Sequence, residues 1–205
     1  MIKTPSKEES PNWKIRLFIK WLNYQCPRAW QLGCSVAVNE MAMPFKGYHR
    51  DKIHITYKAE GDGFQADDLC ADSYCYKVYM RNDRALKKYL KQGISPLHSW
   101  TMALFDSLKD DYHQVGMDNI YNSVSFCISA YHHDPKVLYH GRSRKAVRGI
   151  TKYVLQDEEN NPVAQQAARG TFKADILEGD PGCSNIIVYS VYATKPVHYL
   201  SMVSK

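Results

Sequence analysis

The strongest constraint on the fold is a pair of adjoining stretches that carry the pattern of β-strands. Residues 64–71 are interpreted as one strand. In residues 74–80, tyrosine, valine and methionine alternate with cysteine, lysine and a further tyrosine, which is the period of two that a strand with two different faces requires. The pattern predicts two neighbouring strands, with Asp72 at the carboxyl end of the first.

Further along the chain, signals for helices and strands alternate. Ser95-Pro96 has the N-cap and first-turn pattern of a helix, residues 112–117 form a short strand that ends at Asp118, and Asn122-Ser123 begins another helix. Three more stretches are predicted to be strands: residues 137–140, 186–192 and 197–203. The order strand, strand, helix, strand, helix, strand predicts an α/β fold with a mixed sheet and flanking helices.

The two ends of this pattern differ from its centre. Residues 1–11 are polar and are expected to be a disordered tail. A helical lead-in follows over residues 12–34, in which an amphipathic helix continues to about Tyr24 and is stopped at Cys26-Pro27. Residues 156–183 are polar, acidic and rich in glycine, and they are interpreted as an exposed excursion.

Composition narrows the class of protein further. The 205 residues include 27 Lys and Arg against 21 Asp and Glu, a net charge of +6 that permits a polyanionic partner such as nucleic acid. No two of the six cysteines have the spacing of a zinc knuckle, so they are interpreted as buried, reduced thiols. There is no apolar leader at the N-terminus and no apolar run of membrane-spanning length, which predicts a soluble intracellular protein.

Asp72 and Asp118 are the candidate metal ligands, because each ends a predicted strand. Parallel neighbouring strands present their carboxyl ends at one edge of a sheet, where two carboxylates repel each other unless a cation lies between them. Their oxygen atoms suit a hard divalent ion such as magnesium. The alternative is that both are turn residues or helix caps, and the spacing does not decide between these interpretations.

Basic residues form a second candidate site. Arg142, Arg144, Lys145, Arg148 and Lys152 follow one another without an intervening acid, and they are interpreted either as DNA-phosphate contacts or as a solvated loop. A second group is interpreted as a solvated helix face rather than a DNA-binding patch: Arg81, Arg84, Lys87, Lys88 and Lys91. His132-His133 is interpreted as a surface turn rather than a metal cluster. The 15 tyrosines are interpreted as core and sheet residues rather than base-stacking platforms.

Five segments resemble, in the same order, motifs of the piggyBac transposases. Residues 39–47 are similar to the entry motif D-E-x-M-x-x-F-K-G, and residues 69–73 to the strand end with the first catalytic aspartate. Residues 117–123, the most specific match, resemble the D-N-x-Y-T-S motif, which carries the second catalytic aspartate of the family. Residues 141–149 resemble G-T-x-R-x-N-R-K-G, and residues 195–201 resemble K-P-V-x-x-L-S-T.

The resemblance implies an RNase H-like core, incomplete at its C-terminus, over residues 35–150 and part of a β-rich insertion sub-domain over residues 151–205. It makes Asp72 and Asp118 the first two of three catalytic aspartates that bind Mg²⁺ or Mn²⁺. The motif with the third aspartate has no counterpart here, and the turn after Asp72 is about three residues shorter than the family's. Weak or absent metal binding and loss of catalysis are therefore expected.

The expected function is that of a truncated, transposable-element-derived domain, related to enzymes that cut and rejoin DNA but itself inactive. The resemblance implies DNA as a partner and the nucleus as the location, and it is compatible with a homodimer. Two alternatives stay open at this stage. One is a domesticated DNA- or chromatin-binding module without catalysis, and the other is a chain with no selected role and an unfinished fold.

Overall fold

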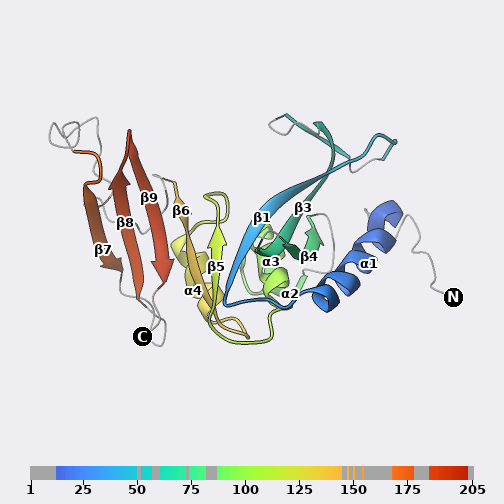
Figure 1. Cartoon of the computed structure of the whole chain (residues 1–205), viewed down its shortest axis with the longest axis horizontal. Helices are drawn as coiled ribbons and strands as arrows, with labels where there is room; N and C mark the ends of the chain where they lie inside the picture. The colour runs from blue at the N-terminus through green and yellow to red at the C-terminus, as the bar shows by residue number, and fades with distance from the viewer. Residues whose placement is uncertain are drawn as a thin grey trace. The chain divides into compact units, whose positions relative to one another are not determined.

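The computed structural model describes residues 13–49, 52–56, 61–72, 74–81, 87–144, 147, 150, 154, 168–177 and 185–202, so the expected tail at residues 1–11 lies outside it. The chain divides into two compact units, Met1–Lys109 and Asp110–Lys205. Both contain helices and strands, as the sequence predicts (Figure 1). No described helix has the length and apolar character needed to cross a membrane.

In the first unit, strand β3 (Gly61–Ala71) lies at the centre of an antiparallel sheet. Strand β1 (Ser35–Pro44) pairs along one edge of β3, and β2 (Ile53–Ile55) and β4 (Tyr74–Met80) pair along the other. The predicted strand pair is thus confirmed. Its register joins Ala71 to Tyr74 across a turn of only two residues.

Helix α1 (Trp13–Ala29) packs against β4 and closes the core of the first unit. The Asn23 side chain donates to the Val78 carbonyl at 2.9 Å and accepts from the Val78 N–H at 2.8 Å. It therefore makes with the outer edge of β4 the hydrogen bonds that a neighbouring strand would make. The core beneath the helix is apolar: Ile19, Phe64, Ala66, Val78 and Met80.

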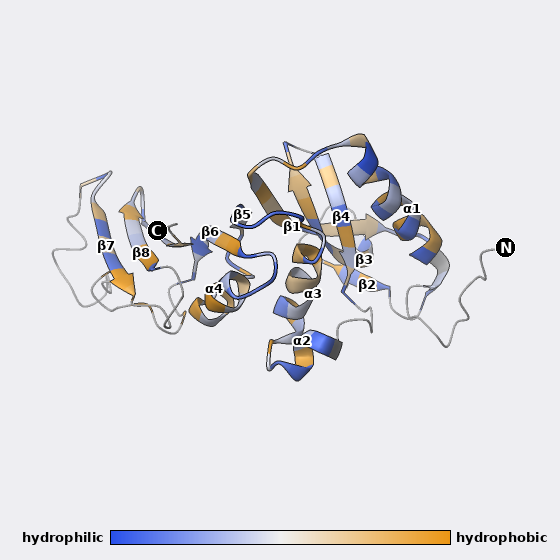
Figure 2. Cartoon of the chain, turned by 90° about the horizontal axis from the view of Figure 1, so that it is seen from below, coloured by the Kyte–Doolittle hydropathy of each residue, from blue (hydrophilic) through white to orange (hydrophobic). Residues whose placement is uncertain are grey.

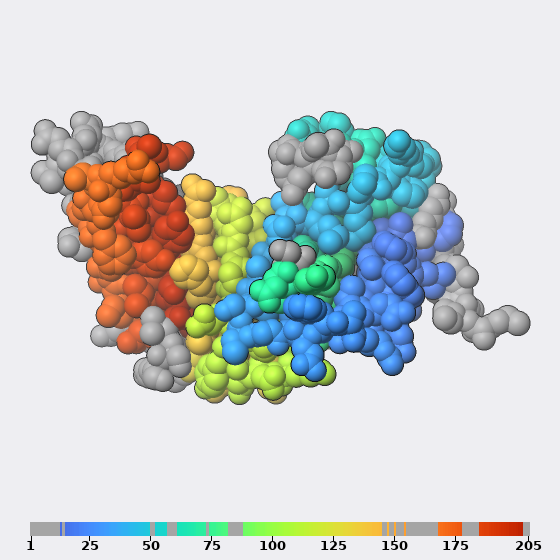
Figure 3. Space-filling model, in the orientation of Figure 1, coloured from blue at the N-terminus to red at the C-terminus, as the bar shows by residue number. Residues whose placement is uncertain are grey.

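The predicted end of α1 is wrong. The helix continues beyond Cys26-Pro27 to Ala29, and the Trp30 N–H still donates to the Cys26 carbonyl at 3.1 Å. A proline this close to a helix end removes a single backbone donor, and packing against β4 offsets that loss. Figure 3 shows α1, in blue, on the surface of the first unit.

Two further helices belong to the first unit, α2 (Lys87–Lys91) and α3 (Pro96–Phe105). The predicted cap of α3 is confirmed, because the Ser95 side chain accepts a hydrogen bond from the His98 N–H at 3.3 Å. Leu104 and Phe105 are completely buried, which fixes this helix against the sheet.

In the second unit, β5 (His113–Met117) and β6 (Val137–Ser143) are parallel, and helix α4 (Val124–Tyr131) connects them. Three antiparallel strands continue the sheet beyond β6: β9 (Pro196–Met202), β8 (Ile186–Tyr192) and β7 (Phe172–Leu177). Buried and half-buried side chains alternate along β8, which is apolar over most of its length (Figure 2).

The interpretation of residues 156–183 as an exposed excursion is wrong for residues 172–177, which form β7 and pair with β8 in a regular register. Residues 156–167 and 178–183 lie outside the described part of the chain. The strand has exposed and half-buried side chains and no fully buried one among its six residues. It therefore lacks the apolar alternation by which a strand is recognised in a sequence.

Candidate functional site

Asp72 lies in the tight turn of the β3–β4 hairpin and is exposed to solvent. Its φ angle of 48° is in the left-handed region, which the two-residue turns of hairpins require. Aspartate adopts this conformation more readily than most residues other than glycine. The turn therefore presents the carboxylate outward at the carboxyl end of β3, as predicted.

Asp118 is exposed at the carboxyl end of β5, directly after the buried Met117. Its Oδ1 accepts a hydrogen bond from the Asn119 N–H at 2.6 Å, which orients the carboxylate at the start of the loop to α4. Because β5 and β6 are parallel, this is the edge of the second unit at which ligands collect in α/β sheets.

The residues after Asp118 hold this loop in place. Tyr121 is completely buried, and the Asn122 side chain donates to the Gly141 carbonyl at 3.3 Å and the Arg142 carbonyl at 2.8 Å. The Ser123 hydroxyl then caps α4 by accepting from the Phe126 N–H at 3.1 Å. Most of the 117–123 motif is thus explained by the need to fix Asp118 against β6.

Beneath Asp118, Tyr139 and Gly141 of β6 pack closely against β5. A side chain at Gly141 would collide with the Met117 carbonyl oxygen and the Tyr139 hydroxyl, so glycine is required there. Tyr139 is completely buried, and its hydroxyl has no hydrogen-bond partner among the described residues. Burial, Cys127 and the charge of Asp118 all raise the pKa of Tyr139.

The two candidate metal ligands belong to different units, Asp72 to the first and Asp118 to the second. Each offers exposed carboxylate oxygens at the end of a strand, which is the donor chemistry that magnesium or manganese takes. In this respect the residues fit a hard divalent cation, and their role as ligands stays a prediction.

Of the predicted DNA-binding run, Arg142 and Arg144 are exposed, at the end of β6 and just beyond it. Lys145, Arg148 and Lys152 lie outside the described residues. Arg142 stands directly opposite Tyr199 of β9, so the two side chains share one face of the sheet.

That face carries a row of aromatic rings, one from each of four adjacent strands. His140 and Tyr199 are 6.2 Å apart between ring centroids, Tyr199 and Tyr189 are 5.0 Å apart, and Tyr189 and Phe172 are 5.5 Å apart. The first two pairs are stacked, with interplanar angles of 15°. No sequence pattern predicts this row, because its members come from β6, β9, β8 and β7 and meet only through strand pairing.

The second basic group does not form one solvated face in the part that the structure describes, which leaves out Arg84 and the Lys87 side chain. Arg81 is largely buried and makes ion pairs with Asp67 at 2.7 Å and Glu40 at 3.1 Å, so its interpretation as part of such a face is wrong. Lys88, by contrast, is exposed and pairs with Asp106 at 2.9 Å. Asp67 lies on the interior of β3, opposite Glu40 of β1, and the two acids need a cation there.

The paired histidines follow α4, and the expected surface position holds for His132 but not for His133. His132 is exposed and caps the helix, whereas His133 is buried and its Nδ1 lies 3.0 Å from the Pro135 carbonyl oxygen. Within the described parts of the chain, no group of three potential metal ligands includes either histidine.

The fold is that of a DDE-type transposase domain. The family model described as Transposase IS4, one of the DDE transposases, matches residues 2–205, and the chain belongs to this family. The comparison with curated proteins finds no significant match.

Among solved structures, the fold is similar to that of a piggyBac transposase in a synaptic complex with hairpin DNA, determined by cryo-EM. The TM-score is 0.75 at 17% sequence identity, and the match covers 97% of this chain. The chain spans 39% of the length of that transposase. The predicted fold class, a mixed α/β sheet with flanking helices, is confirmed by this likeness.

Proposed function

We propose that these 205 residues form part of a metal-dependent DNA-transposition domain, in which Asp72 and Asp118 supply two of the metal ligands. The observation that carries the proposal is the geometry around Asp118. An exposed carboxylate ends a buried parallel strand, and Tyr121, Asn122 and Ser123 fix its loop. Preorganised carboxylates at such an edge are what divalent-metal chemistry on phosphodiesters needs.

A bound Mg²⁺ or Mn²⁺ would supply Lewis acidity at the phosphodiester. The residues of this chain have separate tasks in that scheme. Asp72 and Asp118 provide hard oxygen ligands, and Asn122 holds the Asp118 loop against β6. Arg142 and Arg144, with Lys145, Arg148 and Lys152, neutralise DNA phosphates.

We further propose that residues 1–205 alone bind the metal weakly and do not cleave DNA. The resemblance to piggyBac transposases calls for three aspartates, and two of its aspartate motifs match this sequence. Incubation of the chain with supercoiled DNA and Mg²⁺ or Mn²⁺ tests this proposal, and no nicking above background is expected. Metal-dependent nicking that disappears in Asp118→Ala would overturn it.

A second candidate function is DNA or chromatin binding without catalysis. The aromatic row favours it, because Tyr199 and Tyr189 are half-buried and lie beside the exposed Arg142. Half-exposed rings next to a cation form a surface that unpaired bases can contact while the cation neutralises the backbone. By the resemblance to piggyBac transposases, such a protein would act in the nucleus, and a homodimer is compatible with this role.

Fluorescence anisotropy over a salt series tests the assignment of the basic run to DNA binding. The double variant Arg142→Gln/Arg144→Gln is expected to reduce the salt slope by about 1 for each phosphate that the chain no longer neutralises. Lys109→Gln removes an exposed cation elsewhere and is the matched control. Equal slopes for the two variants would contradict the assignment of the basic run.

The aromatic row has its own test with single-stranded DNA. Tyr199→Ala is expected to weaken binding by about 1–3 kcal/mol, with little change in salt slope. Tyr112→Ala removes an exposed tyrosine of the same unit that lies outside the row, and it is the control. If Tyr199→Ala binds as tightly as the unaltered chain, the aromatic row has no role in binding DNA.

A further inference from the structure

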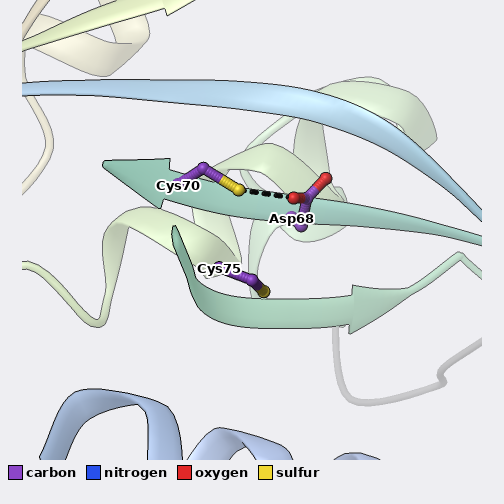
Figure 4. Close-up of side chains that lie close together, drawn as sticks. All are labelled: Asp68, Cys70 and Cys75. Atoms are coloured by element: carbon purple, nitrogen blue, oxygen red, sulfur yellow. Dashed lines mark hydrogen bonds between the residues drawn. The ribbon is translucent and has the colours of Figure 1, made fainter. Parts of the chain in front are cut away.

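Three potential metal ligands come together inside the β3–β4 hairpin: Asp68, Cys70 and Cys75 (Figure 4). Their ligand atoms, one carboxylate oxygen and two sulfurs, all lie within 4.8 Å of one another. The Cys70 thiol also donates a hydrogen bond to the Asp68 Oδ2, 2.6 Å away. None of the three belongs to the sites described above.

A β-bulge assembles this cluster. On β3, Asp68 and Cys70 are two residues apart and therefore point to the same face. On β4 the pairing skips Tyr76, because Lys77 pairs with Leu69 whereas Cys75 pairs with Cys70. The extra residue turns Cys75 to the face of Cys70, where the regular register would have placed Tyr76.

The cluster combines one buried carboxylate with two half-buried cysteines. Asp68 is buried, with 5% of its surface exposed, and it lies between the buried Asp67 and Leu69. Cys70 and Cys75 are half-buried. A bound cation would stabilise a buried carboxylate that lies beside two thiols.

We propose that Asp68, Cys70 and Cys75 form a site for a thiophilic divalent cation, with zinc as the expected ion. Two sulfurs and one carboxylate oxygen are ligands that Zn²⁺ accepts in a tetrahedral shell, and a water completes the fourth position. Binding displaces the two thiol protons and joins β3 to β4 through the metal. Magnesium and manganese prefer oxygen ligands and are excluded by the two sulfurs.

The site is independent of the proposed DNA chemistry, and its position gives it a structural consequence. Cys70 and Cys75 flank the turn that carries Asp72, so a bound ion closes the hairpin immediately behind that residue. We expect backbone amides of residues 68–78 to exchange more slowly with solvent when the ion is bound.

Cobalt is the probe for the first experiment, because Co²⁺ bound to thiolates absorbs light in bands that the free ion lacks. The metal-free, reduced 205-residue chain is titrated with Co²⁺, and Zn²⁺ is then added in competition. One equivalent is expected to produce the thiolate band, and Zn²⁺ should abolish it. Absence of the band at one equivalent would overturn the proposal.

Substitutions assign the ligands. Loss of an outer-shell partner weakens metal binding by roughly 10–100-fold. Cys70→Ser and Cys75→Ser each remove a direct ligand, so each should weaken Zn²⁺ binding by more than that. Cys34→Ser is the matched control, since Cys34 is exposed and outside the cluster. Cys26 is unsuitable as a control because it interacts electrostatically with Cys75. A band that survives both cluster substitutions refutes the site.

A second measurement separates loss of a ligand from loss of the fold. Hydrogen exchange of the β3–β4 peptides is followed with and without Zn²⁺ in the unaltered chain and in Cys75→Ser. Slowing by Zn²⁺ is expected in the unaltered chain alone, while the metal-free rates should match. If the reduced chain binds no metal and mild oxidation links Cys70 to Cys75, the pair is a disulfide pair and the metal site is rejected.

Discussion

Replacement of Arg81 by methionine is expected to be among the most damaging single changes in the first unit. The guanidinium donates to the Asp67 carboxylate through Nε at 3.1 and 3.2 Å and through Nη2 at 2.7 Å, and Nη1 lies 3.1 Å from Glu40. The Asp67 side chain has no exposed surface, and that of Arg81 is 10% exposed. Water therefore cannot replace the lost partner.

The magnitude follows from this burial. Methionine retains most of the apolar stem, so the main loss is the cation that neutralises two interior carboxylates. Removing one partner of a buried pair costs about 3–5 kcal/mol, a large share of the roughly 5–15 kcal/mol by which domains are stable. At Lys88→Met, where the ion pair with Asp106 is exposed, the expected loss is about 0.2–1 kcal/mol.

Urea unfolding monitored by circular dichroism measures both variants, and hydrogen exchange of β1 and β3 peptides assigns the effect to the first unit. The second unit should be unchanged. The double variant Arg81→Met/Asp67→Leu should recover part of the loss, because it no longer leaves Asp67 charged in the interior. If Arg81→Met costs no more than Lys88→Met, the ion pair is not the stabilising element described here.

Two predictions concern the packing beneath Asp118. Gly141→Ala should destabilise the second unit by about 1–3 kcal/mol, because its methyl group meets the Met117 carbonyl. Gly33→Ala, with open space around it, should change the stability by no more than about 0.5 kcal/mol. Equal unfolding midpoints for the two variants would contradict this prediction. The pKa of buried Tyr139 is raised in the folded state, so its contribution to the free energy of unfolding is fully present below the unfolded pKa of about 10. Above that pH the contribution is lost by up to about 1.4 kcal/mol per pH unit. Tyr139→Phe should therefore flatten the alkaline decline in urea midpoint, and an unchanged decline would show that another group is responsible.

Much of the fold follows from patterns that are local in the chain. Alternation over residues 74–80 predicts β4, and the hydroxyls of Ser95 and Ser123 cap α3 and α4 where the sequence places the helix starts. Asp72 and Asp118 are exposed at strand ends for the same reason: a polar residue after an apolar strand stays in solvent. Local patterns predict these features because the alternation between core-facing and solvent-facing residues is contained within each helix or strand.

The interactions between elements are not encoded in such periods. Arg81 belongs to a basic stretch that is typical of a solvated helix face, and it is an interior cation because β3 brings Asp67 to the end of β4. Cys70 and Cys75 lack metal-site spacing, and a one-residue bulge aligns them. The aromatic row needs four strands in register. Strand order and register bring together residues that are far apart in the chain, and a pattern with a period of two or about 3.6 residues carries no information over that distance.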